Sequence, residues 1–236
     1  MEKSLTNVNL FRNIHKGKRA IVCGSGYSIN NINWDNLPND DIIFSCNQSI
    51  TSLNHCNYFC MTDGSIVEAS FFEYGISISD NIMFCSGNSF IVFQPVINIY
   101  EKIKNKSYFL NRRYKSPSDL NFDLDDGLLI TGKDVVHVVS HLAYIMGCCP
   151  IVLIGVDLNY NNGKKYCDSI KYGKEVIWGD QYKVNPIGDT DNILLDSFQT
   201  WISIKTQNPN IKFQNANPNG KLSDIFETIN LNLTIN

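Results

Sequence analysis

The sequence of 236 residues contains no long hydrophobic run and no large excess of either charge. No window approaches the roughly 18–20 uninterrupted apolar residues of a membrane-spanning helix, and the polar first ten residues lack the pattern of a signal peptide. The 20 basic and 23 acidic side chains give a net charge of −3, which offers no broad cationic surface for a polyphosphate backbone. These absences predict a cytoplasmic protein and disfavour a general nucleic-acid-binding protein.

The cysteines lack the spacing of a metal site or a redox motif. None of the eight forms a CxxC pair, and no second pair stands at zinc-site spacing, so no metal is expected. Four cysteines end short apolar runs, namely Cys23, Cys46, Cys60 and Cys85. This pattern predicts buried, inert thiols in a reducing compartment.

Apolar runs of strand length alternate with segments of helical length, of which residues 133–146 are the clearest. Such alternation is typical of parallel strands joined by crossover helices. The composition, with 43% hydrophobic side chains, fits one α/β domain over residues 1–236. We therefore predict a Rossmann-like, mostly parallel sheet covered by helices on both faces. The predicted strands are residues 19–23, 41–46, 58–61, 81–85 and 151–154.

Two stretches interrupt this alternation, and the end of the chain resumes it. Residues 103–127 and 158–189 have no clean period and are expected to be insertions at strand ends, the second forming a small lid. After them we predict a helix over 193–204, a strand over 211–214 and a last helix over 222–229.

A glycine-containing turn, with Gly24, Ser25 and Gly26, follows the first predicted strand. Glycines at this position let backbone N–H groups approach a phosphate or nucleotide. The third glycine of a dinucleotide fingerprint is missing, and Asn47 and Gln48 stand where an acidic residue would bind a ribose. We predict a nucleotide site that uses neutral amides, with a plain tight turn as the alternative.

The segment from Gly127 to Asp134 is similar in sequence to the phosphate-binding P-loop motif, but its interior is apolar and its last position lacks the hydroxyl that would bind Mg²⁺. A strand end followed by Thr131, Gly132 and a helix start explains it better. On that helix, His137 and His141 share a face among Val, Leu and Ala, which favours core histidines over metal ligands.

A carboxylate and two tyrosines follow the strand at 151–154. Asp157 comes at its end, and Tyr160 and Tyr166 flank an Asn-Gly turn. Phenol hydroxyls above a sheet edge can hold a leaving phosphate. The alternative is that the tyrosines only pack or face solvent.

Taken in order, these segments resemble the bacterial sialyltransferases of glycosyltransferase family 42. Gly24-Ser25-Gly26-Tyr27-Ser28 resembles that family's G-N-G-P-S turn, and Phe44-Ser45-Cys46-Asn47-Gln48 resembles its F-x-C-N-Q segment. Similar matches are Leu37-Pro38-Asn39-Asp40, Ile130-Thr131-Gly132, the run from Gly155 to Tyr166, Ile187-Gly188-Asp189 and Asn217-Pro218-Asn219.

The resemblance implies an inverting transfer of sialic acid, or a related sugar acid, from a CMP-linked donor without an obligatory cofactor or metal. The acceptor would be a glycan or glycolipid in a bacterial lipopolysaccharide or capsule. We further expect a homo-oligomer in the cytoplasm, with peripheral association at the cytoplasmic face of the inner membrane as an alternative location. Tyr160 and Tyr166 would hold the departing phosphate, and Asp189 stands where the family has its catalytic histidine. The residues expected to contact the nucleotide are Gly24, Ser25, Gly26, Asn47, Gln48, Thr62, Thr131, Gly132 and Asp157.

Two other functions remain open from the sequence. The chain also resembles the group of 6-hydroxymethylpterin pyrophosphokinase-like and Maf-type flagellin glycosylation proteins, which implies ATP-dependent pyrophosphoryl transfer with Mg²⁺. Asp63, Asp157 and Asp189 are the candidate ligands of that ion. Because Asp189 replaces the expected histidine, a non-catalytic nucleotide-binding protein is the third hypothesis.

Overall fold

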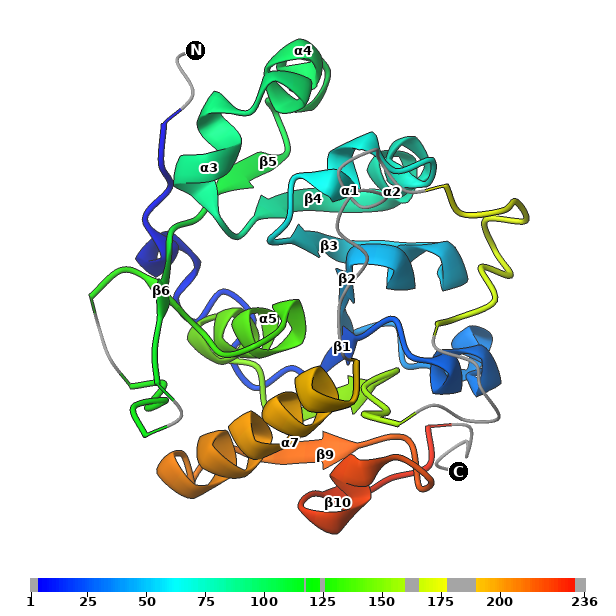
Figure 1. Ribbon diagram of the computed structural model, residues 1–236, viewed down its shortest axis with the longest axis vertical. Helices are drawn as coiled ribbons and strands as arrows, with labels where there is room; N and C mark the ends of the chain where they lie inside the picture. The colour runs from blue at the N-terminus through cyan, green and yellow to red at the C-terminus, as the bar shows by residue number, and fades with distance from the viewer. Residues whose placement is uncertain (1–3, 117, 124–125, 160–165, 178–189, 232–236) are drawn as a thin grey trace.

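The computed structural model describes residues 4–116, 118–123, 126–159, 166–177 and 190–231, with only the backbone described for 190–193. These residues form an α/β fold around one eight-stranded sheet, in which every pair of neighbouring strands is parallel (Figure 1). The predicted fold class is confirmed. The strands are β1 (Ala20–Cys23), β2 (Ile42–Cys46), β3 (Cys56–Met61), β4 (Ser79–Phe84), β5 (Ser107–Phe109), β8 (Ile151–Ile154), β9 (Phe213–Asn215) and β10 (Glu227–Thr228).

The sheet has the order β10-β9-β8-β1-β2-β3-β4-β5. The chain therefore starts in the middle, steps outward through β5, and returns to the other side of β1 with β8. Val22 pairs with Phe44 of β2 on one side and with Leu153 of β8 on the other. The order reverses between β1 and β8, and in open α/β sheets ligands bind beyond the carboxyl ends of the strands at such a switch point.

Alternate residues of the central strands enter two separate cores. Val22, Phe44 and Leu153 belong to one core, whereas Ile21 and Val152 belong to the other. All five are buried, because helices cover both faces and leave no solvated side that would require polar residues. This burial explains why the strands are nearly continuous apolar runs in the sequence.

The two faces are covered by different helices. One core contains side chains of α5 and α7, and the other contains side chains of α1 to α4. Asp134 begins α5 by accepting a hydrogen bond from the His137 backbone N–H, as a helix-capping carboxylate does. The helices are α1 (Ser65–Glu68), α2 (Phe72–Ile78), α3 (Gly87–Val92), α4 (Gln94–Ile103), α5 (Val135–Ile145) and α7 (Thr190–Gln207). The 3₁₀ helices are η1 (Val8–Phe11), η2 (Tyr27–Asn31), η3 (Trp34–Asn36), η4 (Asn47–Ser52) and η5 (Lys221–Asp224).

The predicted last helix over 222–229 is wrong. The segment forms η5 and then the edge strand β10, whose Glu227 and Thr228 pair with Gln214 and Asn215 of β9. The unpaired edge of β9 satisfies its backbone with this segment, and this tertiary pairing outweighs the local helical pattern.

The stretch at 103–127 also contains strands that were not predicted. Its first part forms β5 and extends the main sheet, and Arg112–Tyr114 forms β6, which pairs in parallel with β7 (Leu129–Thr131). Strands of three residues give too few alternations to be read from one sequence.

No helix in the described ranges is long and apolar enough to cross a membrane.

Candidate functional site at the switch point

The ends of β1 and β8 lie in direct contact at the switch point. The N–H of Gly24 donates to the carbonyl of Ile154, and the N–H of Gly26 donates to that of Gly155, both at 2.7 Å. Gly155 has φ = +63°, and a Cβ there would lie 2.3 Å from the Gly24 carbonyl oxygen. The glycines of the turn thus permit this close approach, and the N–H groups of Gly24 and Gly26 are already paired rather than open to a phosphate.

Asp157 links three segments just beyond this contact. Its buried carboxylate accepts hydrogen bonds from the Ser28 backbone N–H at 2.9 Å and from the Ser28 hydroxyl. It also accepts one from the Asn217 side-chain amide at 2.8 Å. The carboxylate therefore holds η2 and the turn after β9 in place at the edge of the sheet. Ser28 and Asn217 were not among the predicted site residues, although both stand in the motifs that follow β1 and β9.

Asn47 and Gln48 follow β2 next to the same edge. Asn47 has φ = +52°, a conformation that asparagine adopts more readily than most residues. Its Oδ1 and the Oε1 of Gln48 are buried without a hydrogen-bond partner in the structure. Gln48 as a whole is 5% exposed. Since buried polar atoms are nearly always paired, two unpaired amide oxygens side by side in the chain require an explanation.

Hydrogen bonds hold the ends of β1 and β2 together. The Ser49 hydroxyl donates to the carbonyl of Cys23 and accepts from the N–H of Cys46, both at 2.9 Å. The Ser25 hydroxyl donates to the carbonyl of Cys46 at 3.2 Å. The segments carrying the turn and the two amides therefore form one connected structure.

Residues 166–177, the longer described part of the predicted lid, pack over these ends. The N–H of Cys167 donates to the Ser25 carbonyl at 2.9 Å, and the N–H of Tyr172 donates to the Thr51 carbonyl at the same distance. Tyr166, one residue before this contact, is 40% exposed. Tyr160 and Asp189, the other predicted catalytic residues, lie outside the described residues.

Thr62 lies farther along the same edge, after β3. It lines a pocket of about 250 Å³ together with Gly64, Ser89, Phe90 and Phe93. Hydroxyl or amide side chains therefore follow β1, β2 and β3 at this edge, whereas β8 is followed by the carboxylate of Asp157.

Thr131 and Gly132 are placed differently from the other predicted nucleotide-binding residues. Thr131 is 1% exposed, and its hydroxyl donates to the Gly132 carbonyl at 3.2 Å. A Cβ on Gly132 would lie 2.4 Å from Cγ2 of Thr200, so this glycine is required by the packing of α7. Among the described residues no hydrogen bond joins Thr131 or Gly132 to Asn47 or Asp157.

The two histidines of α5 are core residues. His141 accepts a hydrogen bond from the Ile130 N–H at 2.8 Å through Nδ1, and its Nε2 lies 3.1 Å from the Phe122 carbonyl oxygen. Burial lowers its pKa to about 4. His137 is also buried, against Trp201, and burial lowers its pKa as well. The interpretation of both residues as core histidines is confirmed.

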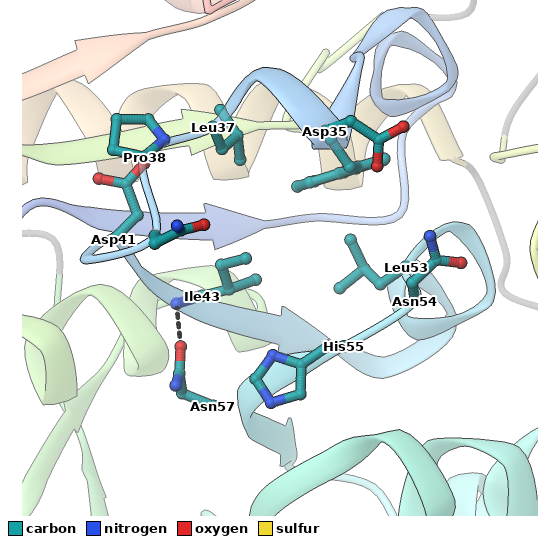
Figure 2. Close-up of a pocket in the computed structure, with 11 residues that line it drawn as sticks. Asp35, Leu37, Pro38, Asp41, Ile43, Leu53, Asn54, His55 and Asn57 are labelled. Carbon is teal, nitrogen blue, oxygen red and sulfur yellow. Dashed lines mark hydrogen bonds between the residues drawn. The ribbon is translucent and has the colours of Figure 1, made fainter.

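Two further pockets lie at opposite edges of the sheet. One, of about 440 Å³, lies at the carboxyl edge between η2 and the turns after β9 and β10. The other, of about 270 Å³, lies at the amino edge, where Asp41 precedes β2 and His55 precedes β3 (Figure 2). Among the described residues no three His, Cys, Asp or Glu side chains gather as a metal site would require.

The model of one protein family matches residues 1–163, which run from the N-terminus past Asp157 and cover well over half of the chain. That family is described as 6-hydroxymethylpterin diphosphokinase MptE-like. The chain belongs to the MptE-like family. No curated protein matches the sequence of this chain.

Solved structures of a bacterial sialyltransferase share the fold. CstII from Campylobacter jejuni in complex with CMP-3FNeuAc is 19% identical, with a TM-score of 0.54 over 92% of this chain and 88% of that one. CstII with CMP gives 18% identity and a TM-score of 0.53, with 94% and 89% of the two chains covered. A CST-II complex with a trisaccharide acceptor and CMP gives 17% and 0.53, with 92% and 88% covered. At these identities the likeness shows the fold.

Proposed function

We propose that this chain is an inverting glycosyltransferase that uses a nucleotide-activated sugar, with a CMP-linked sugar acid as the donor. The observation that carries the proposal is the pair of buried, unpaired oxygens, Asn47 Oδ1 and Gln48 Oε1. An unpaired buried acceptor costs about 1–3 kcal/mol, so its retention at the switch point is explained if a ligand supplies the missing donor.

A cytidine nucleotide offers suitable donors. Its base carries an exocyclic amino group and its ribose carries two hydroxyls, and all of them can donate to amide oxygens. Neither base nor ribose is charged, which agrees with neutral amides at the end of β2. The CMP complexes of the CstII fold relatives support the same choice.

In the proposed reaction, the acceptor hydroxyl oxygen attacks the anomeric carbon of the donor sugar while the bond from that carbon to the phosphate oxygen breaks. Asp189 takes the proton of the hydroxyl, and Tyr160 and Tyr166 hold the departing CMP phosphate. Asp157 fixes the turn beneath the nucleotide through Ser28. The acceptor is a glycan or glycolipid of a bacterial surface polysaccharide.

Calorimetric titration of CMP tests the nucleotide site. Asn47→Ala is expected to weaken binding by about 1–3 kcal/mol, because a ligand donor loses its partner. The matched control is Asn57→Ala at the amino edge of the sheet, which should leave CMP affinity unchanged. Unchanged CMP affinity in folded Asn47→Ala, or equal binding of GDP or NAD, would contradict the assignment.

Turnover of CMP-sialic acid tests the proposed base. Asp189→Asn should lower turnover by about 10²-fold with nucleotide affinity nearly unchanged, since general-base catalysis contributes about that much. Equal turnover of the parent and Asp189→Asn would show that Asp189 is not the general base. CMP binding without any turnover over a broad acceptor panel would favour the non-catalytic hypothesis.

The family match favours a second candidate, pyrophosphoryl transfer from ATP to 6-hydroxymethylpterin. Such a reaction needs Mg²⁺ bound by carboxylates. Of the candidate ligands, Asp63 accepts the N–H of Ser65 at 2.9 Å and Asp157 is held by Ser28 and Asn217. Consumption of ATP in the presence of the pterin and Mg²⁺, abolished by EDTA, would favour this candidate over the glycosyltransferase.

A further inference from the structure

The pocket of about 440 Å³ lies at the carboxyl edge, on the β8–β10 side of the switch point. Its walls come from three segments that each follow a strand: η2 after β1, the turn after β9, and the residues after β10. Its volume lies within the roughly 300–1,000 Å³ of small-molecule sites. The two amides of the proposed nucleotide site, Asn47 and Gln48, do not line it.

The lining of this pocket carries no charged side chain. Ser28, Asn217, Asn219 and Thr228 contribute hydroxyls and amides, and the remainder includes aliphatic residues such as Ile32 and Pro218. A phosphate or a carboxylate would require a cation or several directed N–H groups. A neutral sugar ring has hydroxyls for the polar groups and C–H faces for the aliphatic ones, so it matches this lining.

The pocket and the switch point share one anchor. Ser28 and Asn217 both line the pocket, and both donate hydrogen bonds to the buried carboxylate of Asp157. Asp157 accepts at both oxygens and is 6% exposed, so its charge is satisfied within the protein. A sugar in the pocket would therefore meet fixed, neutral walls directly beside the proposed nucleotide site.

We propose that this pocket binds a neutral monosaccharide unit and that it is the subsite for a sugar of the acceptor glycan. The assignment to the acceptor rests on the proposed glycosyl transfer. The expected binding of a neutral sugar does not rest on that reaction, because it follows from the lining of the pocket alone.

Saccharide binding to the full chain, measured by saturation-transfer NMR and titration, tests the proposal. The probes are methyl β-D-galactopyranoside and N-acetylglucosamine, which are neutral, and N-acetylneuraminic acid, which is charged. Thr228→Trp fills the pocket from an exposed position on the edge strand β10, where an aromatic residue is well tolerated. Ala216→Leu fills it from another wall, and Asn54→Trp is the control, because it places the same side chain at an exposed position of the amino-edge pocket.

The expected result is that at least one neutral sugar binds the parent and Asn54→Trp, and that it binds both filled variants at least about tenfold more weakly, with the melting temperatures retained. The proposal is overturned if no neutral sugar binds, if N-acetylneuraminic acid binds most tightly, or if both filled variants bind as the parent does. Loss of CMP binding in Thr228→Trp would also overturn it, because the pocket would then belong to the nucleotide. If CMP binds neither the parent nor any variant, but the filled variants still lose the neutral sugar, the sugar site is supported and the proposed nucleotide-dependent function is contradicted.

Discussion

The two edges of the sheet both carry polar residues and pockets, but they differ in how their polar atoms are paired. At the carboxyl edge, Asn47 Oδ1, Gln48 Oε1 and Asn30 Nδ2 are buried and lack partners in the structure. None of the residues that line the amino-edge pocket has such an atom. The same strands contribute to both edges, so the difference does not come from the sheet itself.

The amino-edge pocket shows what a satisfied polar surface looks like. Arg19 donates to both oxygens of Asp41, at 2.8 and 2.6 Å. The Asn57 side chain accepts from the Ile43 N–H at 2.8 Å, as the dashed line in Figure 2 marks. A wall whose groups bond to one another stabilises the protein, whereas an unpaired buried acceptor costs stability unless a water or a ligand pairs it. The amide oxygens at the end of β2 are therefore the groups that the proposed nucleotide would pair, and the amino-edge pocket offers no such group.

The largest expected effect concerns the backbone of the carboxyl edge. Gly155→Ala should destabilise the protein by about 3 kcal/mol or more, because it combines left-handed strain with a clash against the Gly24 carbonyl. Gly173→Ala is the control, since Gly173 also has a positive φ but has open space around it, so a loss of only about 1 kcal/mol is expected. Chemical denaturation measures both values. Equal losses would show that the contact between Gly24 and Gly155 is not tight.

The next effect tests a buried polar group that is fully paired, His141. Its pKa falls from about 6.5 unfolded to about 4 folded, so the neutral form is favoured in the native state. Stability from this group is complete above pH 6.5 and is lost as the pH falls toward 4, by about 3 kcal/mol in total. His141→Gln should flatten this part of the stability curve. An unchanged slope between pH 6.5 and 4 in the variant would show that other groups cause it.

Exchanging one amide at each edge sharpens the comparison directly. Gln48→Met removes an unpaired acceptor, so it should leave the free energy of unfolding unchanged or higher while CMP binding weakens by about 1–3 kcal/mol. Asn57→Ala removes paired groups, so it should lower stability by about 1–2 kcal/mol without an effect on CMP. For each of the two variants, urea titration measures the free energy of unfolding and calorimetry measures the CMP affinity. If Gln48→Met lowered the stability and Asn57→Ala weakened CMP binding, the ligand site would lie at the amino edge and the comparison would be wrong.

The smallest expected effect concerns the thiols. Burial raises the pKa of Cys23, Cys46 and Cys60, near the carboxyl edge, whereas Cys149, just before β8 at the amino edge, is exposed. Iodoacetamide should label about one cysteine per native chain, at Cys149, because the thiolate is the reacting species. Mass spectrometry of the modified peptides identifies the site. Rapid labelling of Cys46 in the native protein would mean that the end of β2 opens readily.

Much of the fold could be predicted because the buried strands are long enough to show their pattern. The strands at 19–23, 41–46 and 151–154 agree closely with β1, β2 and β8. The predicted helix at 222–229 failed because pairing with the β9 edge, a contact with no local signal, decides that segment.

The candidate site could be predicted only in part from the sequence. Asn47, Gln48 and Asp157 could be singled out because polar residues at the end of a buried strand are conspicuous. The bond between Ser28 and Asp157 joins residues 129 positions apart, and no local pattern reports such a partner. The turn with Gly24 and Gly26 does follow the first strand, but the close approach of Gly155 and Asp157 that requires glycine there is visible only in three dimensions.

The most direct test of the central claim, that the unpaired amides at the carboxyl edge bind a cytidine nucleotide, follows the side-chain NH₂ resonances of asparagine and glutamine by NMR as CMP is added. The resonances of Asn47 and Gln48, assigned by Asn47→Ala and Gln48→Met, are expected to shift in a saturable way while those of Asn54 and Asn57 stay in place. Saturable shifts at the amino edge with none at Asn47 and Gln48, or no shift anywhere at millimolar CMP, would contradict the claim.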